Sequence, residues 1–191
     1  MNPSPLYTNT DHGTLLNVAH NAISHGLSKG EPASVESDSF SKPLQGHAAS
    51  FVTLKYAGSL RGCIGTLQAV RPLVADVNEN AYAAAFRDPR FLPLSDRELS
   101  GLHISISILS PPEPISFVSE QDLLGQLRAG IDGLILEETH HRGTFLPAVW
   151  ESLPDPETFL QQLKIKAGLR SDYWSSTLRI YRYQTEVIQR D

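Results

Sequence analysis

Two glycines flank the only cysteine of the chain, inside a segment that otherwise has the residue pattern of a β-strand. The segment is Leu60-Arg61-Gly62-Cys63-Ile64-Gly65, and it follows the strand-like residues 51–56 and the turn signal Ala57-Gly58. Glycine weakens a strand interior, so a glycine on each side of Cys63 predicts a bulge, a bend or a close approach of another segment. We therefore expect a β-hairpin around which the rest of the chain is organised.

The loop of this hairpin sets a register. A two-residue loop at Ala57-Gly58 would place Arg61 opposite Leu54 and Cys63 opposite Val52. Because Arg61 and Cys63 are two residues apart, an extended strand would present both side chains on one face.

Cys63 admits two interpretations. A bend between the glycines can aim backbone N–H groups into an anion-binding concavity, and such a concavity beside Arg61 would favour a thiolate. A free cysteine is also among the most buried residue types and usually acts as a small hydrophobic residue. His47, just before the first strand, is one candidate base for the thiol, and an exposed loop histidine is the alternative.

The remaining elements alternate between helices and short strands. Apolar periodicity, capping residues and prolines predict helices over 11–30 and 72–87, a short helix after the capping box at 95–98, and helices over 119–127 and 155–168. Alternation predicts strands over 103–109, 134–136, 144–146 and 178–183. Hairpins with helices between them indicate an α+β fold with a mostly antiparallel sheet flanked by helices.

Composition and charge limit the classes of binding partner that we expect. The net charge is −5, the pI is near 5.8, and no Lys/Arg-rich run occurs, so DNA is not an expected partner. A single cysteine allows no internal disulfide, which suits a reducing cytoplasm. Residues 1–13 are polar and the chain has no apolar spanning run, so we expect a complete cytoplasmic protein with no membrane segment. Neither a metal-ligand spacing nor a cofactor fingerprint is present, so we expect no metal and no cofactor.

Several motifs together resemble one family. The segment Leu60–Gly65 resembles the signature of the AMMECR family, whose bacterial and archaeal members are often called AmmeMemoRadiSam system protein A. The resemblance covers about residues 12–188 and identifies residues 1–191 as one AMMECR-type domain. The further matches, in chain order, are Phe51-Val52-Thr53-Leu54, Asp88-Pro89-Arg90-Phe91 with Pro93-Leu94, Ser107-Ile108-Leu109-Ser110-Pro111, Asp132-Gly133-Leu134, Phe145-Leu146-Pro147, and Lys166-Ala167-Gly168-Leu169 with Trp174.

The resemblance implies a larger and a smaller lobe, a cleft near Arg61-Gly62-Cys63, and an association with radical SAM and Memo-like proteins. Two functions follow as hypotheses. Cys63 and Arg61 would act as catalytic residues of an enzyme, or the same cleft would be a non-catalytic binding or adaptor module for a small anionic ligand or a protein partner. The candidate ligand-binding residues are Gly62, Ile64, Gly65, Asp88 and Arg90, and the Asp88–Arg90 pair either fastens its loop or lies at the rim of the cleft.

Overall fold

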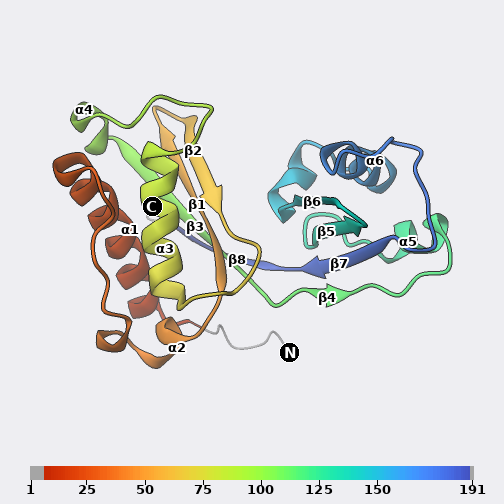
Figure 1. The fold of residues 1–191 in the computed structure, drawn as a ribbon, viewed down its shortest axis with the longest axis horizontal. Coiled ribbons are helices and arrows are strands. Elements are labelled where there is room, and N and C mark those ends of the chain that lie inside the picture. The colour runs from red at the N-terminus through yellow and green to blue at the C-terminus, as the bar shows by residue number, and fades with distance from the viewer. Residues whose placement is uncertain (1–6, 190–191) are drawn as a thin grey trace. The chain divides into compact units, whose positions relative to one another are not determined.

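The computed structural model describes residues 7–189, and these form two compact units. The first comprises the described residues up to Leu109 together with those from Glu186, and the second comprises Ser110–Thr185. Each unit has its own four-stranded sheet (Figure 1). Each also has its own apolar core.

The first unit is a sheet with its helices on one face. Its sheet has the order β2-β1-β3-β8, and α3 packs on β1 and β2 while α1 packs on α3 (Figure 1). The elements are α1 (Asn9–Lys29), η1 (Ser37–Ser39), α2 (Lys42–Gln45), β1 (Ala49–Tyr56), β2 (Ser59–Gly65), α3 (Leu73–Phe86), α4 (Asp96–Leu99), β3 (Leu102–Leu109) and β8 (Thr185–Gln189).

Apolar spacing explains this packing. The buried face of α1 repeats every three or four residues, and alternate residues of β1 and β3 are buried opposite it. Small residues of α3 let that helix approach the sheet closely. The core includes Leu15, Ala19 and Ile23 of α1, Val77, Ala81 and Ala84 of α3, Val52 and Leu54 of β1, and Ile106 of β3.

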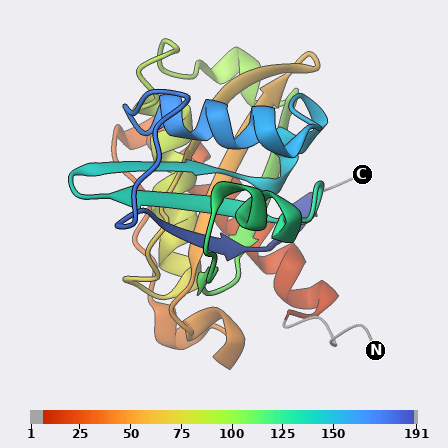
Figure 2. The same cartoon turned by 90° about the vertical axis from the view of Figure 1, so that its right-hand side faces the viewer.

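The second unit has a sheet of order β4-β7-β5-β6. Helix α6 lies beside the β5–β6 hairpin (Figure 2), and Trp150 stacks on Phe159 of α6 with ring centroids 3.7 Å apart. The elements are β4 (Glu113–Pro114), α5 (Glu120–Gln126), β5 (Gly133–Glu138), β6 (His141–Phe145), η2 (Pro147–Glu151), α6 (Pro156–Lys166) and β7 (Arg179–Tyr183).

The predicted α+β class and its antiparallel pairing are confirmed. The strands divide into two sheets, however, and β8 follows β7 after a break at Gln184 that periodicity did not reveal. The cleft implied by the family resemblance stays a prediction.

The predicted hairpin is present, but its predicted register is wrong. Ala57 and Gly58 both have positive φ, 48° and 79°, and form the two-residue loop between Tyr56 and Ser59. A bulge then displaces the pairing, so that Leu54 pairs with Gly62 and Thr53 with Cys63. The physical reason is one extra residue in β2, because Leu60 pairs with Lys55 and Arg61 is left over.

Gly62 is required by close packing against α3. A Cβ atom at this position would overlap the carbonyl oxygen of Ala84. The contact is between two main chains, so a flexible side chain cannot relieve it. The glycine therefore holds β2 against the helix.

We predict that Gly62→Ala lowers the free energy of unfolding by about 1–3 kcal/mol, because overpacking forces the backbone of β2 or α3 to move. Denaturant titration measures the loss. Gly13→Ala is the matched control: a Cβ at that helical position meets nothing within 4 Å, and the change should stabilise the protein by roughly 0.5–1 kcal/mol. Equal stability of the two variants would contradict the packing argument.

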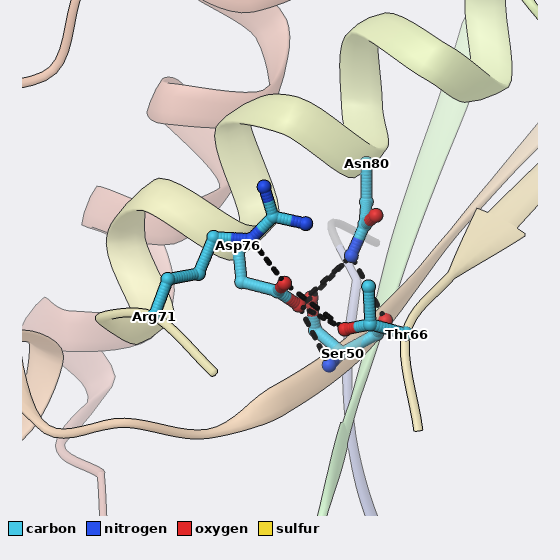
Figure 3. A network of polar contacts seen from close by, with 5 residues as sticks. All are labelled: Ser50, Thr66, Arg71, Asp76 and Asn80. Atoms are coloured by element: carbon cyan, nitrogen blue, oxygen red, sulfur yellow. Dashed lines mark hydrogen bonds and ion pairs between the residues drawn. The ribbon is translucent and has the colours of Figure 1, made fainter. Parts of the chain in front are cut away.

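A buried carboxylate also joins α3 to the sheet. The fully buried Asp76 accepts hydrogen bonds from the N–H and hydroxyl of Ser50, at 2.9 and 2.7 Å, and from the Asn80 amide at 2.8 Å (Figure 3). The Thr66 hydroxyl and Arg71 Nε donate as well, at 3.0 and 2.8 Å. One side chain thus ties together the start of β1, the segment after β2 and the first turns of α3.

We predict that Asp76→Ala destabilises the protein by about 3–5 kcal/mol, because it leaves several buried donors without an acceptor. Thermal unfolding checks this. Asp172→Ala, which removes an exposed ion pair with Arg170, should leave the melting temperature unchanged. A wild-type melting temperature for Asp76→Ala would refute the central role of the carboxylate.

Candidate functional site

Cys63 lies on the face of the sheet that α1 and α3 leave uncovered. Gly62 meets α3 and Ile64 packs on the core of the first unit, so the pleat of β2 directs Cys63 to the opposite face. There its Sγ lies 3.3 Å from Thr53 Oγ1 on the neighbouring strand. The thiol-bearing residue is only partly buried.

An aspartate and an arginine complete the hydrogen bonding of Cys63. The Cys63 N–H donates to Asp88 Oδ2 at 2.9 Å, and Arg90 Nη2 donates to the Cys63 carbonyl at 3.3 Å. In an antiparallel ladder both groups of one residue point to the same side, and β2 is an edge strand. The Asp88–Arg90 pair therefore occupies the position that another strand would take beside Cys63.

Arg90 is held rigidly and still faces solvent. Its Nε and Nη2 donate to the two carboxylate oxygens of Asp88 at 2.9 and 2.7 Å, and its side chain remains 53% exposed. The hydrogen bonds from Arg90 and from the Cys63 N–H hold the pKa of the Asp88 carboxyl well below its usual value. The pKa of Arg90 is raised, first by its hydrogen bonds to Asp88 and also by its proximity to Cys63. The predicted pairing of Asp88 with Arg90 is thus present, and it fastens the loop to β2.

Arg61 makes a different ion pair. Its Nε donates to Glu98 Oε1 at 2.6 Å and its Nη2 to Glu98 Oε2 at 3.3 Å, and both side chains are largely buried. These bonds lower the pKa of Glu98 to about 2. Both guanidinium groups lie near the ring of Phe91, with the ring centroid 5.9 Å from that of Arg61 and 5.4 Å from that of Arg90. The cation in direct contact with Cys63 is therefore Arg90, whereas Arg61 anchors α4.

The other predicted residues divide between the two faces of β2. Gly62 and Ile64 face the core, and Gly65 pairs with Phe51, whose ring lies where a Cβ of Gly65 would be. The sequence predicted a concavity of free backbone N–H groups at this bend. At Cys63 the prediction is wrong, because Asp88 of the same chain accepts a hydrogen bond from that N–H.

Sequence reasoning missed two contributors, Thr53 and Glu98. Thr53 follows from the alternation of β1 once the bulge is known, since the corrected register brings it opposite Cys63. The sequence predicts Glu98 only as part of a capping box, and it fills that role as well, because it accepts from the Ser95 N–H at 2.9 Å.

Histidines and metal ligands do not gather at the site. Within residues 7–189, the Cys63 thiol makes its hydrogen bond with Thr53 and none with a histidine or a carboxylate. His47 pairs with Pro72 in an isolated bridge. Across the same part of the chain, no group of three or more His, Cys, Asp or Glu side chains could hold a metal ion. None of the described helices is long and apolar enough to cross a membrane.

These features define an α+β protein with two antiparallel sheets and a glycine-flanked cysteine on an edge strand. The model of the AMMECR1 family matches residues 16–188, and the chain belongs to this family.

Relatives and a solved structure agree with the assignment. A protein of Methanothermobacter thermautotrophicus is 37% identical over 184 residues, which are 93% of each chain. Protein SSO0193 of Saccharolobus solfataricus is 44% identical over 70% of this chain and 62% of its own length. The crystal structure of the uncharacterized protein PH0010 from Pyrococcus horikoshii aligns with a TM-score of 0.86 and 31% identity, over 96% of this chain and 93% of that one.

The Arg61–Glu98 pair predicts an acid-dependent stability. The pKa of Glu98 is about 2 in the folded chain and ordinarily 4.5. A depressed pKa adds stability above pH 4.5, which is lost as the pH falls toward 2. We predict that Glu98→Gln lowers the unfolding free energy at pH 7 by on the order of 3 kcal/mol and flattens its dependence on pH across this window. Urea titrations from pH 2 to 7 measure both effects.

Asp96→Asn is the control for Glu98→Gln, since Asp96 is an exposed neighbour on the same helix. It should keep the acid-dependent slope of the wild type. An unchanged slope in Glu98→Gln would show that the ion pair does not stabilise the fold.

Proposed function

We propose that the surface around Cys63 binds an anionic group, and that Arg90 supplies the positive charge. The observation that carries this proposal is the geometry of Arg90. Asp88 fixes its Nε and Nη2, so the guanidinium is pre-oriented while its side chain stays half exposed beside the thiol. A guanidinium that is already ordered loses little entropy on binding a carboxylate or a phosphate.

The contacts of Cys63 support binding more than nucleophilic catalysis. A cysteine nucleophile requires a thiolate, which an adjacent base or cation provides, and often N–H donors that stabilise developing charge. Here the hydrogen-bond partner of the thiol is a threonine, and the Cys63 N–H already donates to Asp88. Arg61, the cation first expected at the thiol, is engaged by Glu98.

A Cys63-dependent enzyme is the second candidate. One observation favours it: Cys63 is partly exposed, and Arg90 Nη2 donates to its carbonyl at 3.3 Å, so a guanidinium lies beside this residue. A neighbouring cation is a general feature of reactive cysteines. We further propose that the protein acts together with radical SAM and Memo-like proteins. Either partner would supply the anionic ligand to this site or consume the product formed there.

Alkylation of Cys63 tests the proposal, because the chain has one cysteine and every label reports on this site. We predict that inorganic phosphate slows alkylation of the wild type, and that Arg90→Ala weakens the protection about tenfold, as expected for loss of one charge-assisted hydrogen bond. Arg97→Ala, at an exposed arginine of α4, should protect as the wild type does.

The pH dependence of the same reaction separates the two candidates. An alkylation midpoint near the ordinary thiol pKa of about 8.5 agrees with a binding surface. A midpoint well below it, which rises in Arg90→Ala, would place the enzyme first. Absence of phosphate protection in the wild type would refute anion binding at Arg90.

A further inference from the structure

The face of the first sheet opposite α1 and α3 carries polar side chains in cross-strand rows. Alternation along β1 and β3 places one residue in two on this face, and the register aligns them. Thr53 pairs with Cys63 on one side and with Ser105 on the other. We call Cys63, Thr53 and Ser105 the hydroxyl row. All three residues are partly exposed, and the row begins at the strand edge where Arg90 is fixed.

The neighbouring row carries positive charge. Lys55 lies two residues along β1 from Thr53, pairs with His103 on β3, and is exposed, as is His103. On the other side of the hydroxyl row, Phe51 pairs with Ser107.

None of the three rows contains a carboxylate, although the whole chain has a net charge of −5. The carboxylate at the end of the hydroxyl row, Asp88, is buried and paired with Arg90. The cationic groups that this face offers to solvent are therefore the exposed part of the Arg90 guanidinium and Lys55.

We propose that this face binds a small polyhydroxylated metabolite with two anionic groups, of the sugar bisphosphate class. One phosphate binds Arg90, the second binds Lys55, and hydroxyl groups of the ligand contact Thr53 and, one strand farther from Arg90, Ser105. The inference rests on the proposed anion binding at Arg90 and specifies the ligand of that site.

Strand geometry sets the length of such a ligand. Neighbouring strands lie about 4.8 Å apart, and two residues along a strand span about 6.6 Å. The cationic ends of the face are thus separated by on the order of 10 Å, which is beyond the reach of one phosphate but within that of a bisphosphate. Serine and threonine hydroxyls both donate and accept, as hydroxyl groups of a ligand require.

Protection of Cys63 from alkylation tests the proposal with two probes, inorganic phosphate and fructose 1,6-bisphosphate. The bisphosphate should half-protect the wild type at a concentration at least tenfold lower than phosphate does. Lys55→Ala and Ser105→Ala should each raise the half-protecting concentration of the bisphosphate about fivefold to tenfold, and should leave that of phosphate unchanged. Lys29→Ala, at an exposed lysine in the last turn of α1, should change neither concentration.

The outcomes distinguish this inference from the proposal on which it rests. Protection by phosphate that depends on Arg90, without tighter binding of the bisphosphate or without an effect of Lys55→Ala and Ser105→Ala, would overturn the ligand class and leave anion binding intact. Absence of protection by either probe would overturn both. Lys55 and Ser105 lie outside the buried core, so both variants should keep the fold. Circular dichroism of each variant checks this.

Discussion

The main chain of β2 rests directly on the main chain of α3 at Gly62, and this contact decides which face of β2 carries Cys63. With a side chain at Gly62, strand and helix would have to separate. Their close approach determines which face of β2 is covered. The alternation of the strand then presents Cys63 on the other face, beside Thr53.

Two aspartates also fasten α3 to the sheet. Asp76, in the first turns of α3, accepts from the N–H of Ser50 in β1, and Asp88, just after the helix, accepts from the N–H of Cys63 in β2. Each carboxylate thus satisfies a main-chain donor of the sheet and also orients an arginine, Arg71 or Arg90. The helix is therefore fastened to the two strands at both of its ends. The loop that carries Arg90 is held in place by the same contacts with the sheet.

The sequence predicted the α+β class, the central hairpin, its loop and the pairing of Asp88 with Arg90, because periodicity, turn residues and short-range charge pairs are local signals. It did not predict which arginine contacts Cys63. Arg61 is nearer along the chain, but one extra residue in β2 changes the pairing, and a choice between Glu98 and the thiol depends on where α4 packs. Alternation predicts the strand over 103–109, but only the register aligns Ser105 with Thr53 and Cys63.

The cap formed by Asp88 and Arg90 on β2 also limits how this protein can associate with others. An uncapped edge strand offers its N–H and C=O groups to any extended chain, and strands of separate molecules join in this way during aggregation or peptide capture. At Cys63 both groups are already engaged within the chain. A partner that approaches β2 at Cys63 therefore meets side chains rather than open main-chain groups, so its recognition at this residue depends on charge and shape instead of on β-strand addition.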